Sequence, residues 1–382
     1  MSLTTDPPSA DDSRVSRSIA LAAAMLVSFA AGRRFEARRT GTARPPRAEE
    51  RAPGRETDSR DRRRASEPGR GREANAPAEI PARGWKDIAW RVALGTVEDR
   101  ILANAGGVTF YALLGLFPAL ATLVSLYGLF ADASTIRSHL VLLSNILPAA
   151  GIELIGEQIA RVAAQDAQTL GLAFFTGFAV SLWSANAGMS ALFDALDVVY
   201  KEHEKRSLIR FYATTLAFTF ASIVFLIFAI AAVVVLPVIL KSAGFATTAE
   251  QLLAILRWPI LFGVVVAGLA IVYRHGPSRR DPKWRWVSWG SVAAALLWIA
   301  ASMLFSWYVA RFDRYNQTYG SLGAAVGFMT WIWISSVVVL FGAELNAEIE
   351  HQTAKDSTEG RPKPLGARGA EMADTVGKAQ GR

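Results

Sequence analysis

The chain has 382 residues, of which 52% are hydrophobic and 19% charged, and its formal net charge is +8. The charges are gathered in blocks, and the apolar stretches between them reach the ~20 residues that a helix needs to cross a bilayer. This pattern excludes a water-soluble globular fold, and the lack of period-two alternation excludes a transmembrane β-barrel. No cysteine is present, which excludes disulfides and thiolate chemistry. The predicted fold is an all-α, polytopic bundle of transmembrane helices.

Residues 1–83 are predicted to form a basic, disordered N-terminal tail with a short apolar segment at 18–32. Between residues 33 and 72 the tail holds fourteen arginines among proline, glycine, serine and glutamate, and such a composition buries too little apolar surface to become ordered. We expect the arginines to act as a positive-inside topology signal and to contact anionic lipid headgroups; nucleic acid is not an expected partner. Segment 18–32 is short for a crossing, and it suits an uncleaved signal-like helix, an extra crossing or a helix lying on the membrane.

The membrane domain is predicted to cover residues 84–352. It begins with an amphipathic helix at 85–102 whose tryptophans suit the headgroup region of the bilayer. A polar C-terminal tail, residues 353–382, is predicted to be disordered. Six spanning helices are expected between these segments, at residues 105–130, 170–199, 211–240, 252–273, 288–309 and 324–343.

Lysine and arginine in the loops predict the orientation of the bundle. Loops 200–210 and 274–287 are strongly basic, whereas 131–169, 241–251 and 310–323 hold one or two such residues each. Both ends of the membrane domain are therefore predicted to be cytoplasmic, and the protein is expected in the cytoplasmic membrane. Within the long outer loop, residues 152–162 predict an amphipathic helix on the outer membrane surface or capping the bundle.

The second predicted span carries a polar stripe, because its polar residues recur every three or four positions. A carboxylate inside a membrane marks a cavity, a proton relay or an ion pair within the bundle. Tyr111 in the first span and Glu344 at the end of the sixth complete a predicted cavity. Its predicted lining is Tyr111, Asn186, Ser190, Asp194, Asp197 and Glu344.

A structural interpretation of the same residues stays open. Asp194 and Asp197 lie near a basic loop and would form interfacial salt bridges there, and Glu344 with Glu348 would pair with a basic loop or bind a cation or proton. The small residues around Tyr111 also suit close helix packing.

Ordered motifs between residues 85 and 352 resemble the YihY/BrkB family of bacterial integral membrane proteins, once labelled ribonuclease BN. The most specific are the runs YNQTYGSLG at 315–323 and GAELNAE at 342–348, and shorter matches include Phe110-Tyr111 and Phe117-Pro118. The resemblance implies six spans with cytoplasmic ends and an association with transport or lipid export, envelope integrity and, in some members, serum resistance. It implies neither a substrate nor catalytic residues. The signature positions are Tyr315, Asn316, Thr318, Tyr319, Gly320, Gly342, Glu344 and Asn346.

No catalytic, cofactor or metal site is expected, and the chain is not expected to be an enzyme. The four histidines stand apart in loops, unlike the clustered His and Asp ligands of a metal-dependent ribonuclease, and no G-x-x-x-x-G-K-[ST] loop occurs. The histidines are His139, His203, His275 and His351.

Two functions stay open. The first is a transporter or exporter of lipid or another envelope component, working through the polar cavity. The second is a non-catalytic membrane scaffold for envelope integrity, in which the polar groups serve helix packing. Polar groups at mid-membrane cost free energy that a scaffold need not incur, which favours transport. Neither substrate, coupling ion nor oligomeric state follows from the sequence.

Overall fold

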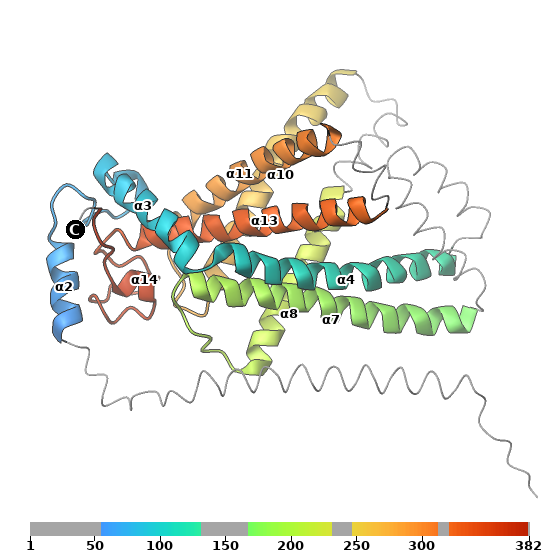
Figure 1. Ribbon diagram of the computed structural model, residues 1–382, viewed down its shortest axis with the longest axis horizontal. Helices are drawn as coiled ribbons and strands as arrows, with labels where there is room; N and C mark the ends of the chain where they lie inside the picture. Colours follow the sequence, from blue (N-terminus) through green and yellow to red (C-terminus); the bar gives the residue numbers. More distant parts are fainter. Residues whose placement is uncertain (1–54, 131–166, 231–246, 312–320, 381–382) are drawn as a thin grey trace, which may run out of the picture. The chain divides into compact units, whose positions relative to one another are not determined.

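The computed structural model describes residues 55–130, 167–230, 247–311 and 321–380. Most of these residues are helical, and they form no β-strand beyond one isolated bridge, between Pro282 and Thr358. Two compact units divide the chain, residues 1–60 and 61–382, and the long helices all lie in the second. The elements are α2 (Arg55–Ala65), the 3-10 turn η1 (Pro77–Glu79), α3 (Ala82–Glu98), α4 (Ile101–Phe130), α7 (Ala167–Val199), α8 (Leu208–Ile230), α10 (Thr247–His275), α11 (Trp284–Arg311), α13 (Ser321–Glu350) and α14 (Glu371–Asp374) (Figure 1).

Four of the described helices contain a stretch long and apolar enough to cross a membrane: Leu208–Phe225, Trp258–His275, Trp284–Val309 and Ala325–Glu350. Large apolar side chains stand exposed on these helices, among them Phe220 at 61% and Leu304 at 65%, as expected for surfaces that face lipid. The prediction of an all-α membrane protein is confirmed. The remaining long helices, α4 and α7, coincide with the first two predicted spans, while the count of six crossings and the cytoplasmic position of the ends stay predictions.

Small residues allow the helices to approach closely. Helix α4 packs mainly against α7, and α13 packs against both α4 and α11 (Figure 1). A Cβ atom at Gly115 of α4 would lie 3.3–3.4 Å from backbone atoms of Ser184 and Ala185 in α7. Gly290 and Gly342 likewise bring α11 and α13 together, so that any Cβ there would meet the backbone of the other helix. Close packing therefore accounts for at least part of the small-residue stripe.

Helix α3 lies against α13 through its apolar face. Ile88 and Val92 are buried there in a cluster with Trp286 and Ile349. The sequence predicts one amphipathic helix over 85–102, but α3 ends at Glu98 and α4 begins at Ile101. The chain turns between them, and the turn holds the buried carboxyl group of Asp99.

The predicted disorder is wrong for residues 61–82 and 353–380. The tail is held by arginines that donate to its carbonyl oxygens: Arg368 bonds the carbonyls of Ala354 (2.6 Å) and Ala373 (2.6 Å), and Arg72 bonds those of Gln352 (3.1 Å) and Gly377 (2.7 Å). A guanidinium group offers five donors, so it can order a segment that buries little apolar surface. Composition, which measures apolar burial alone, misses this.

Several predictions fall outside the described residues. They concern the apolar segment 18–32, most of the arginine-rich stretch 33–72, the outer amphipathic helix at 152–162 and the signature residues 315–320.

Candidate functional site

The polar stripe of α7 is divided between a buried and an exposed part. Asn186, Ser190 and Asp197 are 6%, 4% and 5% exposed, whereas Trp183 is 48% exposed and Asp194 is also exposed. At 100° per residue the three buried residues lie within about 40° of one another, and the two exposed ones lie at one edge of the stripe. Of the predicted cavity residues on α7, Asp194 is thus set apart from the buried group.

The buried part of the stripe faces α8 and the loop after α10. The Ser190 hydroxyl bonds Thr215 Oγ1 of α8 at 3.4 Å, and Asp197 Oδ1 accepts the backbone N–H of Ser278 at 2.7 Å. Asn186 Oδ1 and Asp197 Oδ2 are buried and have no hydrogen-bond partner among the described residues. Tyr111 on α4 is half-buried. Buried polar atoms without partners are costly, so this stripe is polar beyond what helix packing needs.

Glu344 lies in a different place, where α13 meets the turn between α3 and α4. Its side chain is 1% exposed and packs against Gly95 of α3, where an added Cβ would collide with the carboxyl group. Asp99, 6% exposed, comes next to it from the turn, so two buried carboxyl groups lie close enough to influence each other. Two carboxyl groups side by side repel each other when both are ionised.

Lys201, just after α7, is the cation of this site and pairs with Asp99 Oδ1. Asp99 Oδ2 and Glu344 Oε2 have no donor from the described residues. Burial raises the pKa of Asp99, and the neighbouring Lys201 opposes this without reversing it. The Asp99–Glu344 pair, with Lys201, is named the carboxyl pair from here on.

Backbone strain is concentrated at the carboxyl pair. Arg100 and Lys201 have φ values of 50° and 56°, and they are the non-glycine residues with positive φ in the described part of the chain. A left-handed conformation costs a non-glycine residue about 1–2 kcal/mol, and such strain gathers at functional sites. These two turns bring Asp99 and Lys201 together.

Glu348, one turn beyond Glu344, is fully paired. Arg91 of α3 forms a buried ion pair with it, and His351 Nδ1 lies 3.4 Å from its carboxylate. Arg91 also donates to Gln352 Oε1 at 2.8 Å. The interpretation of Glu344 and Glu348 as partners of basic groups therefore fits Glu348, but its partner is on α3 and not in a basic loop.

The sequence singled out Glu344 but missed Asp99, Lys201 and Arg91. Asp99 stands among the charges near the end of the predicted amphipathic helix, where an exposed position is the ordinary expectation. The only signal was the glycine at 95, small enough to admit a side chain from another helix, and one glycine does not identify its neighbour. Of the signature residues, Asn346 ties α13 to α11 by bonding the N–H of Gly290 (2.8 Å) and the carbonyl of Val287 (3.0 Å).

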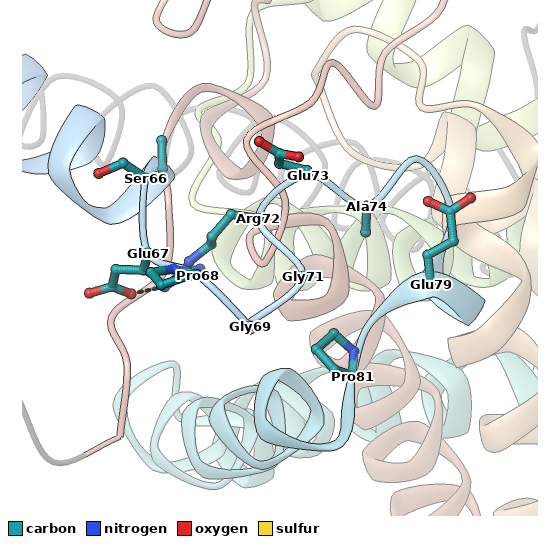
Figure 2. Close-up of a pocket in the computed structure, with 11 residues that line it drawn as sticks. Ser66, Glu67, Pro68, Gly69, Gly71, Arg72, Glu73, Ala74, Glu79 and Pro81 are labelled. Atoms are coloured by element: carbon teal, nitrogen blue, oxygen red, sulfur yellow. Dashed lines mark hydrogen bonds and ion pairs between the residues drawn. The ribbon is translucent and has the colours of Figure 1, made fainter.

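A cavity of about 550 Å³ is lined by residues between 65 and 81 (Figure 2). None of its lining residues belongs to the polar stripe of α7 or to the carboxyl pair. Arg72, the buried cation of its lining, pairs with Glu67 at 3.0 Å, and Figure 2 marks this contact with a dashed line. Burial lowers the pKa of Arg72 while Glu67 works to raise it. Since its buried charge is already matched, we assign the cavity no function.

Within the described residues, no group of three or more His, Cys, Asp or Glu side chains is placed to hold a metal ion. His351 contacts Glu348, and His275 lies 3.5 Å from Asp281. His139 is outside the described part.

Comparison with known proteins gives one family. The family described as "Virulence factor BrkB" matches residues 93–365. The chain is 30% identical over 253 residues to the "Putative ribonuclease-like protein YfkH" of Bacillus subtilis, covering 64% of this chain and 88% of that protein. UPF0761 membrane proteins of Pseudoalteromonas translucida and Vibrio atlanticus are 25% and 26% identical, each over 69% of this chain and over 86% and 82% of their own lengths. No solved structure shows significant similarity.

Proposed function

Because the chain belongs to the BrkB family of bacterial membrane proteins, we propose that it moves a lipid or another envelope component across the cytoplasmic membrane, in which it is an integral protein. Membership of this family shows that the chain is a membrane protein, and the transport activity is our proposal. The ribonuclease-like name is that of the Bacillus relative. We propose a role without catalysis for this chain, since its histidines stand apart in the sequence.

The carboxyl pair carries the proposal. A scaffold needs its buried acids matched by cations, as Glu348 is matched by Arg91. The carboxyl pair has two acids for one lysine, two buried oxygen atoms without donors, and strained turns on either side. An arrangement that stays partly unsatisfied in one state suits a protein that exchanges partners between two states, because the missing partner is available in the other.

The unpartnered atoms of α7 support the same proposal. Asn186 Oδ1 and Asp197 Oδ2 add polar positions along a helix that packs against α4 and α8. These two groups lie about three turns apart on α7, with Ser190 between them, and they offer polar contacts to a headgroup that crosses an apolar bundle.

The test uses the full-length protein in phosphatidylcholine vesicles that contain a trace of fluorescently labelled phosphatidylglycerol. Dithionite destroys the label in the outer leaflet, so the loss of the remaining fluorescence reports the rate of transfer between leaflets.

We expect wild type to accelerate transfer and Glu344→Gln to slow it roughly tenfold, because glutamine keeps the shape of the side chain but cannot release a proton. Asp194→Asn is the matched control, and its rate should stay within about twofold of wild type since Asp194 is exposed. The proposal would be overturned if vesicles with the wild-type protein transferred neither labelled phosphatidylglycerol nor labelled phosphatidylethanolamine faster than empty vesicles.

The ordered tail favours a second candidate function, a membrane scaffold. Residues 353–380 present a folded surface held by Arg72 and Arg368. In a deletion strain, a scaffold predicts that Glu344→Gln restores envelope integrity and that removal of residues 353–382 does not. The transport proposal predicts failure of Glu344→Gln.

A further inference from the structure

A second cavity, of about 440 Å³, lies between the loop after α7, the start of α8 and the loop after α10. Five lysine and arginine residues line it, together with His275, against a single aspartate, Asp281. The cations are Lys205, Arg206, Arg210, Arg279 and Arg280. A concave surface lined by one sign of charge concentrates ions of the other sign.

The internal ion pairs do not neutralise this cavity. Lys205 and Arg206 pair with Glu202 and Glu204, at 2.7 Å in each case. No described carboxylate lies within ion-pair distance of Arg210 or Arg280, so two positive charges remain unmatched. The cavity is therefore suited to an anion.

Arg279 supplies donors that lack acceptors. Its side chain is 1% exposed, pairs with Glu350 and lies over the ring of Tyr200, 4.1 Å from the ring centre. Its Nε and Nη2 atoms are nevertheless buried without a hydrogen-bond partner in the described part of the chain. Since these atoms are buried, Arg279 adds positive charge behind the cavity wall and not a donor that reaches the cavity interior.

The position of the cavity favours a lipid over a soluble anion. Arg210 and Thr214 belong to α8, whose membrane-compatible stretch begins at Leu208. Beside them Leu208 and Ile209 are 60% and 85% exposed. The cavity thus adjoins an apolar helix surface at the boundary where a phospholipid places its phosphate, on the side predicted to be cytoplasmic.

The cavity also connects to the polar stripe of α7. Ser278, in its wall, donates its N–H to Asp197 at 2.7 Å and accepts the N–H of Lys205 at 2.8 Å. A headgroup in the cavity would therefore sit beside the end of the buried stripe.

We propose that this cavity binds the phosphate of an anionic phospholipid, with Arg210 and Arg280 as its cationic partners. As the loading site for cargo it rests on the proposed transport function; as a lipid-binding site it stands independently of that function.

The test is a calorimetric titration of the full-length protein, in an uncharged detergent, with short-chain phosphatidylglycerol, short-chain phosphatidylcholine and inorganic phosphate in turn. Arg210→Gln/Arg280→Gln removes the two unmatched charges and leaves every described ion pair intact. Arg285→Gln is the matched control, because Arg285 is exposed at the start of α11 and does not line the cavity.

We expect wild type to bind phosphatidylglycerol at least about tenfold more tightly than phosphatidylcholine, the double variant to lose roughly tenfold, and Arg285→Gln to match wild type. Equal affinity for inorganic phosphate and phosphatidylglycerol would overturn the lipid assignment, and equal affinity of the double variant and wild type would overturn the site.

The labelled-lipid transfer assay separates the two proposals. Slower transfer by the double variant supports cargo loading. Binding by a wild-type protein that transfers no lipid supports the site and removes the transport function, whereas a double variant with weaker binding and normal transfer overturns the loading role alone.

Discussion

Glu344 and Glu348 lie one turn apart on α13, and both are buried, yet their surroundings differ. Glu348 faces the guanidinium of Arg91 and the ring of His351. Glu344 faces Gly95 and a second acid, Asp99. Helix α3 supplies the difference, because it turns an arginine toward one glutamate and a glycine toward the other. Two glutamates that look alike in the sequence therefore differ in the structure. Glu348 is matched by a cation, whereas Glu344 lies beside a second buried acid.

The largest effect should come from breaking the matched side of this comparison. Arg91→Ala leaves Glu348 as an uncompensated buried charge, and we expect a loss of roughly 3–5 kcal/mol in stability. Thermal unfolding in detergent measures it. Arg83→Ala, an exposed position on the same helix, should change little. A loss no larger than that of Arg83→Ala would mean that Arg91 and Glu348 do not depend on each other.

A smaller effect is expected from closing the space around Glu344. In Gly95→Ala the new methyl group overlaps the Glu344 carboxyl group, which should cost about 1–3 kcal/mol. The same denaturation measurement applies. Adding Glu344→Ala should recover stability relative to Gly95→Ala alone, whereas strictly additive losses would show that the two positions are not in contact.

The smallest effect is a dependence of stability on pH. Burial raises the pKa of Asp99, so the folded state holds its proton more tightly than the unfolded chain. Stability contributed by this group is therefore complete below the ordinary aspartate pKa of ~3.9 and is lost as pH rises through the folded value. The charged neighbours acting on it are Lys201, Glu98 and Glu344.

For Asp87 the dependence of stability on pH has the opposite sign. Burial works to raise its pKa, but the hydrogen bonds from Arg70 (2.6 Å) and the backbone of Gln380, with the charges of Arg70 and Arg91, together lower the pKa, so its contribution is lost as pH falls. Melting temperatures between about pH 4 and 8 should rise relative to wild type at the upper end for Asp99→Asn and fall there for Asp87→Asn. Parallel pH profiles for the two variants would contradict the assignment.

The long helices were predictable to within a few residues at most ends, since an apolar run in lipid must form its backbone hydrogen bonds internally. The break at Asp99 and Arg100 was not predictable, because nothing in the local pattern interrupts a helix there. Within the site, the buried Asn186, Ser190 and Asp197 followed from spacing, but the exposure of Asp194 at the edge of the same stripe did not. About 40° around the helix axis separates Asp194 from Ser190, the nearest of the buried three, and helical spacing alone does not say which neighbour covers which edge.

The sequence by itself determined the solvent, the helical class and the family, because each depends on contiguous stretches of residues. Only the tertiary structure decided which charges are matched. Arg91 and Glu348 are 257 positions apart, Lys201 reaches Asp99 across 102, and the tail is ordered by Arg72 from 280 positions before Gln352. Side-chain pairing at such separations depends on how helices are packed, and the free energy of a buried charge depends on that pairing. The composition of a segment describes neither the packing of the helices nor the pairing of the charges.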